Sequence, residues 1–179
     1  TEAPAATEAP AAACDGDYVL VPKNLGNPYF DTSNKGAQEA AGELGITVLY
    51  QGSATADATE QITLLNSLIA QQPCGLAISA NDADALAPTG KAAMEAGIPV
   101  VTFDSAIAPE GRVFHINQAV LHDIGAVEIQ MASELAGADG GQIAILSATS
   151  TAPNQNAWIE VMKEELTKPE YANLELVEV

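Results

Sequence analysis

Short apolar runs alternate with segments of helical periodicity from Tyr18 to Phe103, and this alternation restricts the fold more than any other feature of the sequence. The runs are Tyr18–Val21, Ile46–Tyr50, Gly75–Ser79 and Ile98–Phe103. Short runs that are apolar on both faces are typical of strands inside a parallel sheet. Strands that alternate with helices are joined by right-handed crossovers. We therefore predict an α/β fold built on a parallel sheet.

The helices expected between these runs have recognisable start and stop signals. The first is ended by Gly45, because glycine tolerates the left-handed conformation that often follows a helix. The second follows a capping signature at Asp57 and is broken by Pro73. In the third, Pro88 is expected to fall near the first turn, where a missing N–H is tolerated.

A second, shorter series of elements follows Ser105. It comprises a β-like run at Val113–Ile116, a helix at Ala119–Leu135, a strand at Ile143–Leu146, a helix through Trp158 and Leu166, and a strand at Leu174–Val179. The strands and helices of this series are too few to cover both faces of a parallel sheet. We therefore expect the second unit to be incomplete in this chain and to be completed by further polypeptide.

The composition argues against several classes of partner. A formal net charge of −18 over 179 residues disfavours binding to nucleic acid or to an anionic membrane surface. No apolar stretch reaches the length of a transmembrane helix. Residues 1–13 are a low-complexity mixture of Ala, Pro, Thr and Glu, so residues 1–16 are predicted to form a disordered spacer. Such a spacer suits a tether between the membrane surface and a folded domain.

Sequence motifs for catalysis or for cofactor binding are absent. The chain has no G-x-S-x-G, no P-loop and no G-x-G-x-x-G after a strand. His115 and His122 have no third ligand at useful spacing, and ordinary loop or surface histidines explain them better than a metal site does. We expect a protein that is not an enzyme and that uses no cofactor and no metal.

Polar side chains instead follow the predicted strands at their C-terminal ends. They are Lys23 and Asn24 after the first strand, Ser79 and Asn81 after the third, Asp104 and Ser105 after the fourth, and Asn154, Gln155 and Asn156 after the first strand of the second series. Taken singly, each is better explained as a helix cap or a solvated loop residue. Together they meet at the sheet edge where open α/β folds bind ligands, and Tyr29 and Phe30 add apolar surface. This mixture of donors, acceptors and rings predicts a site for a polyhydroxylated small molecule.

The motifs at these positions resemble those of type I periplasmic sugar-binding proteins. The segments that carry the resemblance are VPKNLGNPYF, ISANDADAL, VVTFDSAIAPEGR, INQ and NQNAWIEVMKEEL. They succeed one another in order, and the resemblance extends from about Asp17 to Val179. Within that family, the chain is most similar to the branch of rhamnose-binding proteins and autoinducer-2 receptors.

The resemblance implies two doubly wound parallel-sheet lobes that are joined by a hinge and close on a ligand. The N-terminal lobe is expected at residues 17–111 and a partial C-terminal lobe at residues 112–179. The resemblance further implies a periplasmic or extracellular protein that delivers a small sugar to the permease of an ABC transporter. Members of the family continue for much more chain, so the C-terminal half of the receptor is expected to be missing here.

Matched position by position, the resemblance places the ligand-contacting lysine at Lys23, the key aspartate at Asp104, and a pair from the second lobe at Asn154 and Gln155. The autoinducer branch usually has an aspartate in the position of Asn154, which favours a rhamnose-like aldose over autoinducer-2. A sugar-responsive transcription regulator would need a basic helix-turn-helix before the first strand, where this chain has an acidic Ala/Pro-rich segment. An enzyme on a doubly wound sheet would need a nucleophile or a cofactor loop.

The two cysteines, Cys14 and Cys74, are expected to form a disulfide. A 2-1-3-4 strand order would make the first and third strands neighbours, and each cysteine lies just before one of these strands. Exported proteins meet oxidising conditions, which favour the bond. Two unrelated buried thiols are the alternative.

Overall fold

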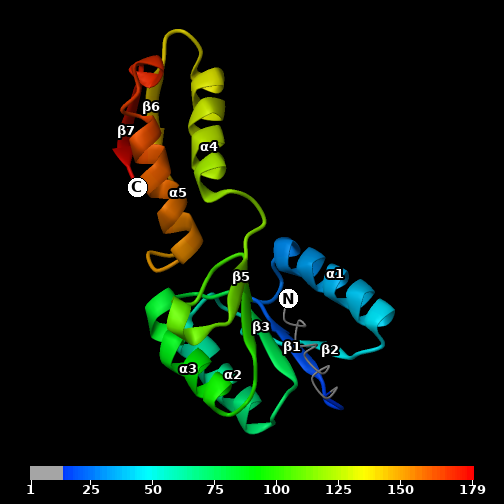
Figure 1. Ribbon diagram of the computed structural model, residues 1–179. Helices are drawn as coiled ribbons and strands as arrows, with labels where there is room; N and C mark the ends of the chain where they lie inside the picture. The colour runs from blue at the N-terminus through cyan, green and yellow to red at the C-terminus, as the bar shows by residue number, and fades with distance from the viewer. Residues whose placement is uncertain (1–13) are drawn as a thin grey trace, which may run out of the picture.

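The computed structural model describes residues 14–179 as two units, each with its own parallel sheet (Figure 1). Residues 1–13 of the predicted spacer lie outside the described residues. The first unit has a five-stranded sheet in the order β2-β1-β3-β4-β5, and every pairing in it is parallel. Its strands are β1 Tyr18–Val21, β2 Val48–Tyr50, β3 Gly75–Ile78, β4 Val100–Phe103 and β5 Phe114–Ile116. The predicted α/β fold with a parallel sheet is confirmed.

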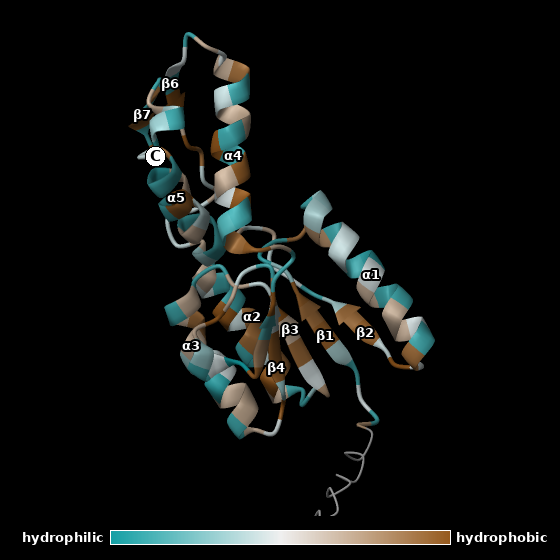
Figure 2. Cartoon of the chain, turned by 45° about the horizontal axis from the view of Figure 1, so that its top comes forward, coloured by the Kyte–Doolittle hydropathy of each residue, from teal (hydrophilic) through white to brown (hydrophobic). Residues whose placement is uncertain are grey.

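Helices cover both faces of the first sheet, as Figure 1 shows. They are α1 Pro28–Leu44, α2 Ala58–Ala70 and α3 Ala83–Glu95, with α2 and α3 on one face and α1 on the other. The main core lies under α2 and α3, where Leu65 and Leu86 pack against Val21, Ile78 and Val100 from the strands. The strands are the most hydrophobic part of this unit, and the polar residues of the helices face outward (Figure 2). The burial of apolar surface on both sides of β1, β3 and β4 holds these three strands in the middle of the sheet.

The second unit is smaller and has a two-stranded parallel sheet. It comprises α4 Leu121–Ala136, β6 Gly141–Ala144, α5 Pro153–Glu165 and β7 Leu174–Glu178, with a 3-10 turn, Pro169–Tyr171, before the last strand. Its core is built around Ile129, Met162 and Leu174. Large apolar side chains are exposed on it, namely Leu135, Leu146, and Val127 and Met131 of α4. Within residues 14–179, none of the helices is both long and apolar enough to cross a membrane.

Strand β5 lies in the first sheet, although the sequence assigned residues from 112 onward to the second lobe. Its residue Phe114 pairs with Val101 of β4, which extends the first sheet beyond the expected boundary after residue 111. A 3-10 turn, Pro109–Gly111, connects the two strands and packs on α3. A run of only three residues has no pattern that reveals which sheet it joins, so only the pairing could place it.

The expectation that Pro88 stands in the first turn of its helix was wrong. Helix α3 begins at Ala83, after an Asp82 cap that accepts hydrogen bonds from the backbone N–H groups of Asp84 and Ala85. Pro88 is therefore inside the helix, on its exposed side. Water can satisfy the carbonyl group that loses its partner there, while the buried side of the helix keeps its packing on the core.

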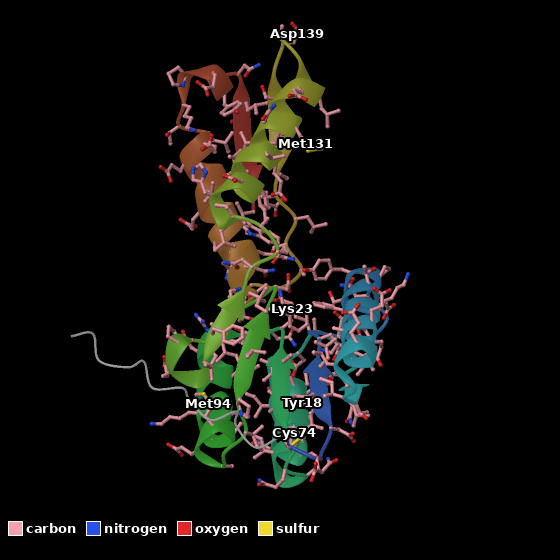
Figure 3. All side chains as sticks on the ribbon, turned by 45° about the vertical axis from the view of Figure 1, so that its right-hand side comes forward. Tyr18, Lys23, Cys74, Met94, Met131 and Asp139 are labelled. Carbon is pink, nitrogen blue, oxygen red and sulfur yellow. A yellow bond between two sulfur atoms is a disulfide. The ribbon has the colours of Figure 1, made fainter. Side chains whose placement is uncertain are left out.

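Cys14 and Cys74 form a disulfide, with their Cα atoms 5.6 Å apart. The bond ties the residues that precede β1 to the turn that precedes β3, and Tyr18 pairs with Gly75 directly after it. The backbone N–H of Cys74 also donates to the carbonyl oxygen of Asp17 at 2.8 Å. Figure 3 shows Cys74 and Tyr18 at the end of the first sheet that is far from the second unit.

Candidate functional site

Three central strands of the first sheet end at the same edge, and each is followed by a polar side chain. Lys23 follows β1, Ser79 follows β3, and Asp104 follows β4. The register makes these ends neighbours, because Val21 pairs with Ile78 and Ile78 pairs with Thr102. Lys23 lies at the end of the sheet that faces the second unit, as Figure 3 shows. This is the position at which open α/β sheets bind ligands.

Lys23 and Asp104 form a buried ion pair, with 3.6 Å between Nζ and Oδ2. The exposed fractions are only 8% for Lys23 and 7% for Asp104, so solvent screens this pair weakly. Burial lowers the pKa of the Lys23 ammonium group, and the charge of Asp104 opposes that effect. A buried ammonium group of this kind can donate hydrogen bonds to a ligand with little competition from water.

Asp104 has a left-handed backbone conformation, with φ at 58°, which is uncommon for a residue other than glycine. The backbone N–H of Ser105 donates to the carbonyl oxygen of Phe103 across this tight turn at 2.5 Å. The turn directs the carboxylate to Ser79, whose Oγ donates to Oδ2 at 2.7 Å, and Gln118 Nε2 lies 3.4 Å from Oδ1. Such strain costs on the order of 1–3 kcal/mol and tends to persist at functional positions.

Asn154, in the first turn of α5, links the second unit to this ion pair. Its Oδ1 accepts a hydrogen bond from Lys23 Nζ at 2.8 Å, and its Nδ2 donates to Asp104 Oδ1 at 2.9 Å. Its Oδ1 also accepts from the backbone N–H of Gln155 at 2.9 Å and faces Ser105 Oγ at 3.4 Å. The side chain of Asn154 is 6% exposed, so both units bury it between them. We call Lys23, Asp104 and Asn154 the junction triad.

The structure brings together five of the residues expected at the site, namely the junction triad with Ser79 and Ser105. Two other expected residues, Asn24 and Gln155, make hydrogen bonds elsewhere. Asn24 donates to the carbonyl oxygen of Leu25, and Gln155 turns toward the second unit, where its Oε1 accepts from Ser147 Oγ and from the backbone N–H of Ala148 at 2.7 Å each. Neither of these two contacts a member of the triad through its side chain among the described hydrogen bonds.

The two aromatic residues, Tyr29 and Phe30, differ in their exposure to solvent. Phe30 is buried and meets the rings of Tyr29 and Phe103 edge to face, with centroid distances of 5.1 and 6.2 Å. Tyr29 is 44% exposed, and partial burial together with the charge of Asp104 raises its pKa. Phe30 thus supports the end of β4, while the ring of Tyr29 packs on Phe30 and is partly exposed to solvent.

A cavity of about 270 Å³ opens beside the triad and adds residues that were not assigned from the sequence. It is lined by Asp104, Ala106, Arg112, His115, Asn117, Leu121, Pro153 and Asn154. His115 bonds to Thr102 and Asn117 through its two ring nitrogens, and burial lowers its pKa. Asn117 and Gln118 belong to the INQ motif noted above, so the sequence offered a signal for them. For Arg112 the sequence offered no signal other than its place in the segment VVTFDSAIAPEGR. Its Nε donates to the carbonyl oxygen of Ile107 at 2.7 Å.

A larger cavity, of about 500 Å³, lies between α1 and the sheet, but its lining is apolar. It includes Ala37, Ala41 and Leu44 from α1, with Leu20 and Val101 from the strands. A polyhydroxylated ligand would lose its hydrogen bonds with water there without regaining them. The cavity beside the junction triad, with Asp104, Arg112 and Asn154 in its lining, suits such a ligand better.

Comparison with known proteins relates this chain to solute-binding proteins. Residues 18–179 match the family model of the periplasmic binding protein domain. Among solved structures, an ABC transporter solute-binding protein from Clostridium phytofermentas with bound L-rhamnose is 36% identical over 93% of this chain, with a TM-score of 0.88. LsrB from Clostridium saccharobutylicum in complex with AI-2 is 28% identical over 89% of this chain, with a TM-score of 0.82. A sugar ABC transporter protein from Actinomyces odontolyticus is 38% identical over 91% of this chain, with a TM-score of 0.67.

This chain spans about half the length of these solved structures, since it covers 52%, 51% and 53% of them. The family model extends over nearly all the residues that the structure describes. The chain belongs to the periplasmic binding protein family.

Proposed function

We propose that this chain is part of an extracytoplasmic solute-binding protein that captures a small, uncharged sugar between its two units and delivers it to an ABC importer. The observation that carries this proposal is the junction triad. It places one cation, one carboxylate and one amide, all buried, where the two units meet. No step of bond making or breaking is needed, so we propose a binding protein rather than an enzyme.

The chemistry of the triad suits a polyol. Adjacent sugar hydroxyls can donate to Asp104 and accept from Lys23 together, because the two charged groups are 3.6 Å apart. Hydrogen bonds to charged groups are stronger than those between neutral groups. The apolar side of Tyr29 can cover the C–H face of the ring. The cavity of about 270 Å³ is a suitable size for one monosaccharide rather than a longer oligosaccharide.

The charges of the triad favour a neutral ligand. Lys23 and Asp104 compensate each other, and Asn154 contributes no charge. A ligand with its own carboxylate would lie next to the Asp104 carboxylate, which is unfavourable in a buried site. We propose a rhamnose-like aldose, in line with the ligand of the protein from Clostridium phytofermentas.

Autoinducer-2 uptake is the second candidate function. It is favoured by the likeness to LsrB, which was solved with AI-2. That structure is 28% identical to this chain, against 36% for the rhamnose-bound protein. The family resemblance implies an aspartate in autoinducer receptors at the position of Asn154, so the amide at this position argues for the sugar.

Delivery to a permease requires further parts of the protein. We propose that additional polypeptide completes the second unit, and we call the resulting assembly the complete receptor. Hinge closure needs two rigid units that enclose the ligand. We further propose a periplasmic or extracellular location, with the Ala/Pro-rich residues before Cys14 as a tether to the membrane surface.

A thermal-shift screen of the complete receptor tests the proposed function. The panel is L-rhamnose, D-arabinose, other pentoses and deoxyhexoses, and autoinducer-2. A ligand at a hundredfold over its dissociation constant should raise the free energy of unfolding by about 2.7 kcal/mol. Stabilisation by rhamnose supports the sugar assignment, and stabilisation by autoinducer-2 alone supports the second candidate. The absence of any shift across the panel contradicts both.

A further inference from the structure

Two amide side chains are fully buried under the candidate site, and neither contacts the cavity. Gln61 on α2 is 1% exposed, and Asn81, which follows β3, is 2% exposed. Buried polar side chains are costly unless they are hydrogen-bonded, so each needs a reason to be there. Their partners give that reason.

Gln61 uses all of its hydrogen-bonding capacity at the ends of β1 and β3. Its Nε2 donates to the carbonyl oxygens of Pro22 at 3.1 Å and Ser79 at 2.8 Å. Its Oε1 accepts from the backbone N–H of Asn81 at 2.9 Å and from Asn81 Nδ2 at 3.0 Å. These backbone groups lie just past the strands, where no sheet neighbour satisfies them.

Asn81 extends the same network to Lys23 and to the second unit. Its Nδ2 donates to the backbone carbonyl oxygen of Lys23 at 2.9 Å. The backbone carbonyl oxygen of Asn81 accepts from Thr151 Oγ1 at 3.1 Å. Its Oδ1 is buried without a hydrogen-bond partner among the described residues.

We propose that Gln61 and Asn81 are positioning residues of the ligand site, which hold the backbone of Lys23 and Ser79 in place without touching the ligand. This inference rests on the proposed function. The pair connects the ends of two neighbouring strands to each other and to the loop that precedes Asn154. The Lys23 ammonium group and the Ser79 hydroxyl can therefore meet Asp104 with little freedom to move. Rigid placement of this kind reduces the entropy that a ligand would otherwise have to remove.

The alternative is that the pair only stabilises the core. Both roles lower stability when Gln61 is replaced, so a loss of stability does not separate them. Two other readouts do: the affinity for the sugar, and the titration of Lys23 in the absence of any ligand. A purely structural residue leaves both unchanged as long as the protein remains folded.

The experiment compares Gln61→Met with Leu65→Ala in the complete receptor. Methionine keeps the length of the side chain but removes its donors and its acceptor. Leu65 lies one turn further along α2, is fully buried in the apolar core, and makes no polar contact with the strand ends, so its truncation destabilises the same helix by a different route. Asn81→Ala and the double variant Gln61→Met/Asn81→Ala complete the set.

Calorimetric titration with L-rhamnose is expected to give at least tenfold weaker binding for Gln61→Met and less than threefold change for Leu65→Ala. Because the two amides act as one unit, the affinity of Gln61→Met/Asn81→Ala should be about as low as that of whichever single variant binds L-rhamnose less tightly. NMR titration of the Lys23 side chain in the unliganded protein should show its pKa moving toward the ordinary value of 10.5 in Gln61→Met but not in Leu65→Ala.

Equal affinities in Gln61→Met and Leu65→Ala, together with an unchanged Lys23 titration, overturn the positioning role. If the unchanged protein binds no sugar but the Lys23 pKa still shifts in Gln61→Met, the positioning role stands and the proposed sugar function fails. If the unchanged protein binds no sugar and the pKa is also unmoved, both are wrong.

Discussion

Replacing Asp104 by asparagine tests the assignment of the site most directly. The substitution keeps the size of the side chain and suits the left-handed backbone at this position, because asparagine adopts that conformation more readily than most residues. It removes the charge that faces Lys23 and turns one acceptor into a donor. A sugar hydroxyl that donated to the carboxylate would lose a charge-assisted bond or meet another donor. The expected loss of affinity is about 2–4 kcal/mol, or roughly 30- to 1,000-fold.

The same change should also lower the stability of the unliganded protein. Removal of one partner from a buried ion pair typically costs about 3–5 kcal/mol, because the other charge stays buried without compensation. Two features of the structure reduce that cost here. Lys23 keeps its hydrogen bond to Asn154 Oδ1 at 2.8 Å, and burial already lowers its pKa, so it can lose its proton. We expect a loss at the lower end of that range.

Calorimetric titration with L-rhamnose and thermal unfolding without ligand separate the two effects. Asp82→Asn is the matched control, because it removes the same charge from the first unit at a helix cap outside the site. Lys23→Met/Asp104→Asn is the second control, since it removes both charges and should recover part of the stability but none of the affinity. Affinity within threefold of the unchanged protein for Asp104→Asn, with a clear loss of stability, would show that Asp104 is structural and that the site is wrongly assigned.

Three further predictions concern the pH dependence, the disulfide and the length of the chain. The pKa of Lys23 is lowered on folding, so as the pH approaches 10.5 the unfolded chain binds more protons than the folded protein, and the Lys23 contribution to the free energy of unfolding should rise with pH. Urea titrations from about pH 8 upward should show the free energy of unfolding of the unchanged protein rising relative to that of Lys23→Met. Tyr29 contributes in the opposite direction, but it does so in both proteins, so its effect cancels in this difference. Replacing Cys14 and Cys74 by serine should cost about 4 kcal/mol for a loop of 60 residues, and a thiol assay on the denatured, unreduced protein should find no reactive thiol; two per chain would contradict the disulfide. The 179-residue chain should bind L-rhamnose far more weakly than the complete receptor, and equal affinities in calorimetry would show that further polypeptide is dispensable for binding.

The fold of the first unit could be predicted because its strands are apolar on both faces and its helices carry clear signals. Gly45 ends α1 with φ at 66°, and Asp57 caps α2 by accepting from the backbone N–H of Glu60, as the sequence suggests. The order β2-β1-β3-β4 is a common arrangement of doubly wound sheets and is expected on that ground. The place of β5 could not be predicted, since a three-residue strand is assigned by its partner and not by its own pattern.

The site was only partly predictable, for a similar reason. Residues directly after a strand have a position fixed by the topology, so Lys23, Ser79 and Asp104 could be placed at one edge. The left-handed backbone of Asp104 and the direct contact of Asn154 with both charges depend on tertiary packing, which no local pattern encodes. Gln61 lies in the interior of a helix where glutamine is an ordinary surface residue, so nothing in the sequence marks it as buried.

The contacts within the junction triad also restrict which ligands can bind. Lys23, Asp104 and Asn154 hydrogen-bond to one another or pair by charge, so a ligand that binds them must replace these contacts. A ligand with one hydroxyl replaces one bond and leaves another buried group unsatisfied, at a cost of about 1–3 kcal/mol. A ligand with adjacent hydroxyls can serve the ammonium group and the carboxylate together, because these groups are neighbours. The triad therefore selects for the arrangement of hydroxyls rather than for their number, and that arrangement is what differs among sugars of the same size.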